Sequence, residues 1–263
     1  MDYNIQLFKN SDCYKQNRKM KPAGIVVHST GVNNTSLSRY VGPDDGRLGA
    51  NKYNNHWNKP GVSSCVHAFI GKDKKGRVCT YQTLPLDICA WGVGKGNKGS
   101  YNYSPAYLQF EILEDNLKNK TYFNKVMKEA QELCAKWCKR YNIPVSKIVS
   151  HAEAHAKGYG SNHSDCDHWL ERFGKDMDWF RAEVRKLLNK STTAVSVGDK
   201  VKVRDGVTTY YNGKKIPAWV KKATLYARQK QVKDGVNVWL VSTNKTLPIY
   251  TGRLKVEDVK KIT

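Results

Sequence analysis

Four of the seven histidines of this 263-residue chain lie in one stretch, IVSHAEAHAKGYGSNHSDCDHW at residues 148–169. A short β-branched run ends at His151, so we expect this residue at the end of a strand rather than inside a helix. A loop rich in Gly and Ser follows and returns with His163, Asp165 and Cys166. Imidazole, carboxylate and thiolate groups are zinc ligands, and a catalytic zinc takes three of them and keeps one position open. The stretch offers two ligands with good geometry, so a third must come from elsewhere.

His28 is the candidate for that ligand. It ends the apolar run AGIVVH at residues 23–28, which predicts a buried strand followed by a turn of small residues. A lone histidine in such a place is more often a hydrogen-bonded structural residue than a ligand. A second strand-end histidine beside a ligand-rich loop reverses that preference, so we predict that His28 and His151 share a metal site.

Two further segments carry groups of chemical interest. Glu111 interrupts the apolar strand LQFEIL at residues 108–113. A carboxylate there costs free energy unless it is paired, exposed or functional, which makes it a candidate general base. The segment DICAWGVG at residues 87–94 places Trp91 beside glycines, which suits stacking on a sugar or peptide, although ordinary loop packing would give the same pattern.

The elements expected around these residues are strands, a hairpin and two helices. Residues 64–70 and 77–81 predict a β-hairpin around the turn GKDKKG. From Thr121 as N-cap, apolar residues three and four apart over 122–141 predict an amphipathic helix with Cys134 and Cys138 on its apolar face. A second helix is expected from about residue 176 to residue 188.

The chain changes character after residue 188. The segment NKSTTAVSV at 189–197 is polar and small and is interpreted as a linker. Residues 198–263 consist of short alternating runs with turns at about ten-residue spacing, which favours a small barrel or sandwich. This part contains no His and no Cys, so we expect a binding module rather than a catalyst.

Composition bounds the class of protein. With 40% hydrophobic and 11% aromatic residues the chain can bury a core, and it has no apolar run of about 18 residues. The N-terminus lacks the pattern of a signal peptide, so we expect synthesis in the cytoplasm. Seven cysteines, mostly in apolar contexts, argue against a disulfide framework.

The formal net charge of +22 is spread over the whole chain. Residues 191–263 hold 15 Lys and Arg against 5 Asp and Glu, a net +10, which leaves +12 for residues 1–190. The partner is therefore expected to be a polyanion or an anionic surface. Nucleic acid and a bacterial wall with teichoic acids fit this charge equally well.

Four motifs in order carry a family resemblance: IVVHSTG at 25–31, DICAWGVG at 87–94, FEI at 110–112 and the histidine-rich stretch from residue 150 to 169. Together they resemble the zinc-dependent N-acetylmuramoyl-L-alanine amidases of the peptidoglycan-recognition fold, in particular phage endolysins, over about residues 20–185. The resemblance implies an α/β domain at 1–188 with a mixed central sheet, flanking helices and a zinc cleft. Residues 198–263 resemble the SH3-like wall-binding modules attached to such lysins.

The resemblance also implies a set of site residues. His28 and His151 become Zn²⁺ ligands, and the third ligand is Asp165, with Cys166 as its competitor. Glu111 takes the position of the water-activating carboxylate. His163 takes the place of a catalytic Lys or Thr of the family, as a departure from its pattern.

The implied activity is cleavage of the amide between N-acetylmuramic acid and L-alanine of the stem peptide, which lyses bacteria. The partners would be peptidoglycan and anionic wall polymers, without nucleic acid and without membrane insertion. The enzyme would be made in the cytoplasm of a host bacterium and would act on the cell wall after release.

Three alternatives remain open. A non-catalytic peptidoglycan-binding protein of the same fold predicts a missing zinc ligand. A Cys/His peptidoglycan peptidase using Cys166 predicts loss of activity on alkylation and indifference to chelators. A nucleic-acid-binding protein with a structural zinc rests on charge alone, because the sequence has no paired Cys-x-x-Cys motif and no recognition-helix motif.

Overall fold

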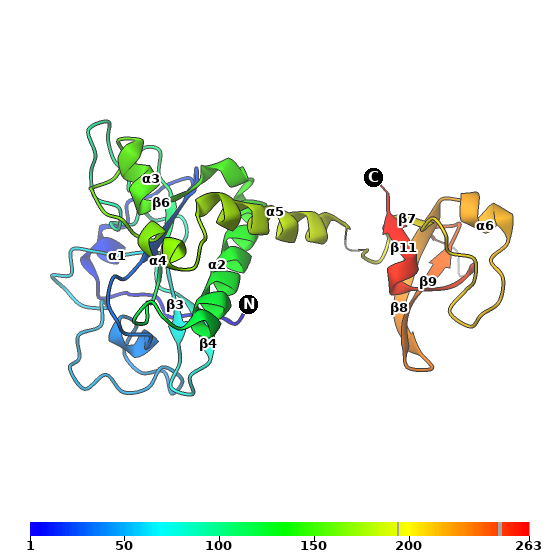
Figure 1. Cartoon of the computed structure of the whole chain (residues 1–263), viewed down its shortest axis with the longest axis horizontal. Coiled ribbons are helices and arrows are strands. Elements are labelled where there is room, and N and C mark those ends of the chain that lie inside the picture. Colours follow the sequence, from blue (N-terminus) through cyan, green and yellow to red (C-terminus); the bar gives the residue numbers. More distant parts are fainter. Residues whose placement is uncertain (194, 247–248, 263) are drawn as a thin grey trace. The chain divides into compact units, whose positions relative to one another are not determined.

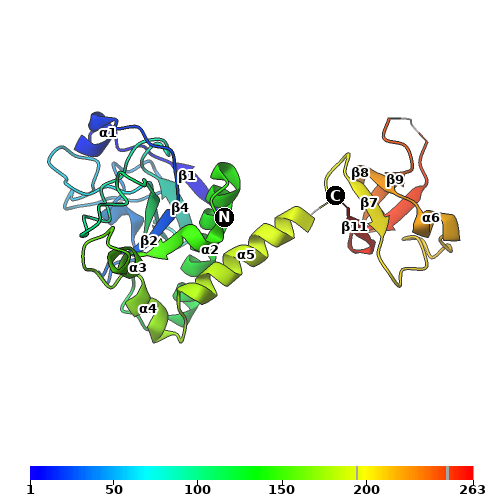
Figure 2. The same ribbon diagram turned by 90° about the horizontal axis from the view of Figure 1, so that it is seen from above.

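A mixed six-stranded sheet forms the centre of the first of two units, Met1–Leu188 and Asn189–Thr263. The structure is a computed structural model that describes residues 1–193, 195–246 and 249–262. Figure 1 shows helices packed around the sheet of the first unit, and Figure 2 shows the same elements after a quarter turn.

The sheet of the first unit has the strand order β1-β4-β3-β5-β2-β6. Its strands are β1 (Tyr3–Ile5), β2 (Ile25–Ser29), β3 (Ala68–Lys72), β4 (Val78–Gln82), β5 (Leu108–Ile112) and β6 (Ile148–Ser150). The hairpin β3–β4 is antiparallel and the other neighbouring pairs are parallel. The expected mixed α/β architecture is thereby confirmed, and the carboxyl ends of β5, β2 and β6 meet at one edge.

Helix α2 (Lys120–Tyr141) covers the sheet with an apolar face that includes Phe123 and the fully buried Trp137. Cys134 and Cys138 lie on this buried face, as the spacing predicts. The N-cap is Asn119 rather than Thr121, because the Asn119 side chain accepts the backbone N–H of Tyr122. The helix therefore begins earlier than expected.

Short helices complete the unit, and the sequence interpretation did not predict most of them. They are α1 (Asp12–Gln16), η1 (Leu37–Arg39), η2 (Val145–Lys147), α3 (His151–Ala156) and α4 (Asp167–Arg172). His151 was expected at a strand end and outside a helix, but it is also the first residue of α3. Ser150 and Glu153 form a capping box that starts this helix directly after β6.

Helix α5 (Met177–Thr193) continues into the segment interpreted as a linker. Residues 189–193 contain neither Gly nor Pro, so nothing in the local sequence ends the helix at Leu188. The remaining linker residues are not helical where they are described, and residue 194 lies outside the described residues.

One disulfide contradicts the expectation from the cysteine pattern. Cys13 of α1 is bonded to Cys65, 52 residues further along the chain. The odd number of cysteines gave no sign of this pair, because only the folded chain brings α1 beside the segment before β3. The other five cysteines are free and buried, as expected.

The second unit is built on an antiparallel sheet in the order β10-β9-β8-β7-β11. Its elements are β7 (Lys200–Val203), α6 (Ala218–Lys222), β8 (Leu225–Lys233), β9 (Val236–Ser242), β10 (Gly252–Lys255), η3 (Val256–Asp258) and β11 (Val259–Lys261). Leu225, Val241 and Leu254 are among its buried core residues. A largely β C-terminal unit is thus confirmed. In the described parts of the chain, no helix is both long enough and apolar enough to cross a membrane.

Candidate metal centre

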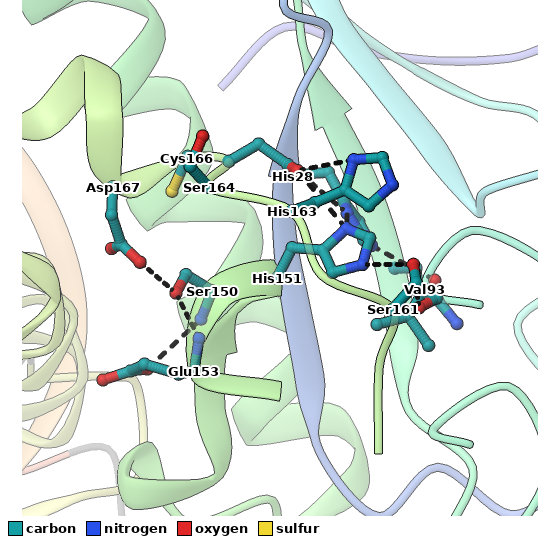
Figure 3. Close-up of polar contacts among 12 residues, drawn as sticks. His28, Val93, Ser150, His151, Glu153, Ser161, His163, Ser164, Cys166 and Asp167 are labelled. Carbon is teal, nitrogen blue, oxygen red and sulfur yellow. Dashed lines mark hydrogen bonds and ion pairs between the residues drawn. The ribbon is translucent and has the colours of Figure 1, made fainter. Parts of the chain in front are cut away.

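Three potential ligand atoms converge beyond the carboxyl ends of β2 and β6. His28 Nδ1 lies 3.1 Å from His151 Nδ1 and 3.0 Å from Asp165 Oδ2. His151 Nδ1 lies 3.3 Å from Asp165 Oδ1. The rings of His28, from β2, and His151, from the start of α3, meet edge to face with centroids 4.8 Å apart, and Figure 3 shows His151 among its polar contacts. The histidines are buried, and the group is the one set of three such residues that could hold a metal ion in the described part of the chain.

These atoms fit the demands of zinc. Ligands about 2.0–2.2 Å from zinc at tetrahedral angles are separated by roughly 3.3 Å, close to the separations observed here. Two imidazole nitrogens and one carboxylate also leave a fourth position of the ion for water or substrate. The donor set is therefore that of a catalytic rather than a closed structural site.

The structure places Asp165, and not Cys166, beside the histidines. Cys166 is fully buried, and its Sγ faces Met177 Sδ at 4.0 Å. Burial raises the pKa of this thiol well above its ordinary value. A buried thiol with a raised pKa is a poor nucleophile, which argues against the Cys/His peptidase alternative.

Backbone contacts hold Asp165 in place. Its carbonyl accepts the backbone N–H groups of His151 and Ala152 at 2.9 and 3.3 Å, so the returning loop is tied to the first turn of α3. Burial opposes ionisation of the Asp165 carboxyl, but the hydrogen bonds from His151 and His28 outweigh it and hold its pKa below the usual range. The side chain is therefore an anion at neutral pH.

Glu111 stands on β5 directly across from His28, its register partner on β2. Its Oε2 is buried, with no hydrogen-bond partner among the described residues. Burial raises the pKa of the Glu111 carboxyl well above its usual value, and the nearby carboxylates of Asp165 and Glu114 raise it further. A carboxyl with a raised pKa takes up a proton more readily than an ordinary glutamate, which suits a general base.

His163 lies at the outer side of the cluster. Its ring stacks on that of His151 with centroids 4.7 Å apart, and its Nδ1 lies 3.9 Å from Asp165 Oδ1. The side chain is 60% exposed. This histidine is thus available to a substrate entering from solvent.

All five predicted site residues line one cavity of about 450 Å³. Aromatic and small residues complete its wall: Tyr40, Trp57, Ser63, Ser64 and Trp91. Trp91 was singled out from the sequence, whereas Tyr40 and Trp57 were not. Their turn-rich segment offered no periodic signal, and only the fold brings Tyr40, Trp57 and Phe69 into mutual ring contact.

Comparison with known proteins gives one family match and several similar solved structures. Residues 18–168 match the family described as N-acetylmuramoyl-L-alanine amidase. Similar solved structures include the Staphylococcus aureus hydrolase AmiA in complex with its ligand, at 19% identity and a TM-score of 0.49, covering 73% of this chain and 84% of that one.

Two others are the catalytic domain of XlyA, at 23% identity, and a mutant endolysin from Bacillus subtilis, at 24% identity. Each covers 70% of this chain and 99% of its own, with a TM-score of 0.47. No curated protein matches the chain.

Proposed function

The chain belongs to the N-acetylmuramoyl-L-alanine amidase family, and on that premise we propose that its first unit is a zinc-dependent hydrolase of peptidoglycan. The bond cleaved is the amide that joins N-acetylmuramic acid to L-alanine of the stem peptide. The convergence of His28, His151 and Asp165 beside the buried Glu111 is the observation that supports this proposal.

Each residue has a part in the reaction. Zinc held by His28, His151 and Asp165 would make water acidic near neutral pH and would polarise the scissile carbonyl. Glu111 accepts the proton of the attacking water and returns it to the leaving amine, since its raised pKa suits both transfers. His163, in its protonated form, donates to the oxygen that becomes negatively charged.

The cavity wall orients the substrate. Trp57 and Trp91 present apolar rings suited to sugar or peptide, and Ser63 and Ser64 add hydroxyl groups that can donate to or accept from polar groups of the substrate. This combination matches a substrate in which a sugar meets a peptide.

The second unit serves as an SH3-like wall-binding module. Its net charge of +10 over residues 191–263 suits anionic wall polymers, and Trp219 and Tyr250 are exposed and available for stacking. The whole protein then acts as a phage endolysin that reaches the wall after release from the host cytoplasm.

Analysis of digested peptidoglycan by mass spectrometry tests the proposed bond. We expect new free L-alanine amino ends and intact glycan strands, and no product after chelation of zinc. New reducing sugar ends, or cleavage between two amino acids of the stem peptide, would contradict the proposal.

A further inference from the structure

The tripeptide Gly92–Val93–Gly94 lies behind both histidines of the metal centre. We propose that this segment, acting through Gln109 and Ser161, holds the rings of His28 and His151 at Nε2 and so keeps Nδ1 of each ring turned to the position that zinc would take. Gln109 and Ser161 are thereby positioning residues, and the inference rests on the zinc role proposed above.

The polarity of the contact to His28 follows from one backbone group. The N–H of Val93 donates to Asn102 Oδ1 at 3.2 Å, so this atom must be an acceptor. Gln109 Nε2 then donates to the same Asn102 Oδ1 at 2.8 Å. With its amide nitrogen turned to Asn102, Gln109 presents Oε1 to His28 Nε2 at 3.2 Å. A carbonyl oxygen only accepts, so His28 Nε2 carries a proton in this contact, while Nδ1 faces His151 and Asp165.

The contact to His151 begins at the other polar group of Val93. The Val93 carbonyl accepts the single hydroxyl proton of Ser161 at 3.3 Å and the Ser161 backbone N–H at 2.9 Å. Ser161 Oγ also lies 3.2 Å from His151 Nε2 and so holds this ring at the nitrogen other than Nδ1. Figure 3 shows this line from His151 through Ser161 to Val93.

The two glycines are required by the atoms of these contacts. A Cβ added to Gly92 would lie 2.6 Å from Gln109 Oε1, and one added to Gly94 would lie 2.6 Å from Ser161 Oγ. These two oxygens face Nε2 of the two histidines. Gly94 also has φ +67°, a conformation that disfavours any side chain. The sequence motif WGVG therefore gives both contacts the space they need.

Further hydrogen bonds hold the Ser161 loop against this segment. The backbone N–H of Lys98 donates to Gly158 O at 2.9 Å, and that of Tyr101 donates to Tyr159 O at 3.0 Å. The rings of Tyr101 and Tyr159 stack with centroids 4.7 Å apart. The loop that carries Ser161 is in this way aligned with Val93 before any metal binds.

Orientation of this kind bears directly on metal affinity. A ring without its contact at Nε2 is free to turn, and Nδ1 would have to return to the position where the three ligand atoms meet before the ring could bind zinc. Loss of a hydrogen-bond partner behind a ligating histidine typically weakens metal affinity about 10- to 100-fold.

Zinc affinity of the full chain tests the proposal by competition with a chromophoric chelator. We expect Gln109→Leu and Ser161→Ala to bind zinc about 10- to 100-fold more weakly, and Ser161→Thr, which keeps the hydroxyl, to stay nearer the wild type. Gly94→Ala should also weaken binding. Its control is Gly174→Ala, at a glycine with φ +62° and no atom within 4 Å of an added Cβ, which carries similar backbone strain away from the site.

Wild-type zinc affinity in both Gln109→Leu and Ser161→Ala would overturn the proposal. Ser161 is half-buried, so Ser161→Ala still judges it if Gln109→Leu fails to fold.

A second measurement reads the rings directly. In the zinc-loaded full chain, two-bond ¹H–¹⁵N NMR correlations should show His28 and His151 bound to zinc through Nδ1 and protonated at Nε2. Coordination through Nε2 of either ring would refute the inference. A wild-type chain that bound no zinc would instead contradict the proposed function.

Discussion

The chemistry of this protein is concentrated in a few side chains whose properties depend on burial. Glu111 is costly to bury as an anion, and nothing among the described residues satisfies its Oε2. That cost is what raises the pKa of its carboxyl. The pKa of the Asp165 carboxyl is lowered instead, because two histidines donate to it. Two carboxyl groups of one cavity thus have opposite pKa shifts.

Replacement of Glu111 by Gln separates chemistry from binding. Glu111→Gln keeps the shape of the side chain and removes the base, so zinc content and wall binding should persist while turnover falls by about two to four orders of magnitude. Zinc stoichiometry and the rate of amide cleavage are the two measurements. Near-normal turnover would mean that Glu111 is only a tolerated residue of β5.

The third ligand is tested by a pair of neighbouring substitutions. Asp165→Ala should lose bound zinc, because it removes the carboxylate between His28 and His151. Cys166→Ala should retain zinc, since the thiol faces Met177 in the core. Metal content of the purified folded variants is the measurement, and the reverse pattern would move the ligand to Cys166.

At the scale of elements, a partly buried ion pair joins α4 to the segment that follows β5. His168, in α4, lies 3.1 Å from Glu114, whose side chain is 3% exposed. The contact to Glu114 raises the pKa of His168 above its ordinary value, and burial opposes this only in part. The backbone carbonyl oxygen of Ser164, 3.3 Å from His168 Nδ1, and the negative charge of Asp165 also raise the pKa of His168. The pair therefore fastens α4 close to the metal centre.

This pair predicts a pH dependence of stability with a defined sign. Because the pKa of His168 is higher in the folded state, its contribution is fully present below about pH 6.5 and is lost as pH rises through the folded-state pKa. His168→Gln should thus cost about 1 kcal/mol at low pH, a value reduced by the partial exposure of the ring, and less at high pH.

Denaturant unfolding of both proteins over a pH series, with chelator present throughout, measures this difference. A difference in the free energy of unfolding that did not change with pH would rule out the ion pair as its source.

At the scale of the whole molecule, the proposed function assigns catalysis to the first unit and wall affinity to the second. The family match covers residues 18–168 and so lies within the first unit. Tethering a basic module to an enzyme raises the local concentration of a polymeric substrate, whereas small fragments gain nothing from it.

Removal of the second unit should therefore affect the two substrates differently. Residues 1–188 should hydrolyse small soluble muropeptides at the rate of the full chain but lyse intact cells more weakly, most clearly at high salt if specific binding holds the enzyme there. Paired assays over a salt series make the comparison. Equal lysis of whole cells at every salt concentration would eliminate the targeting role.

The sequence by itself determined the features that depend on local patterns. Apolar runs ending at His28 and His151, an acid inside the run around Glu111 and helical spacing over residues 122–141 are all short-range signals, and the structure contains the corresponding elements. The capping box at Ser150 was equally local, and α3 could have been predicted from it.

Only the tertiary structure decided which distant groups meet. Asp165 and Cys166 are adjacent in sequence, and the path of one loop turns the first toward the histidines and the second into the core. The disulfide between Cys13 and Cys65 joins residues with no local relation to each other. Val93 contacts Asn102 and Ser161 through opposite sides of its backbone, a relation that residue types cannot reveal because backbone groups are the same at nearly every position.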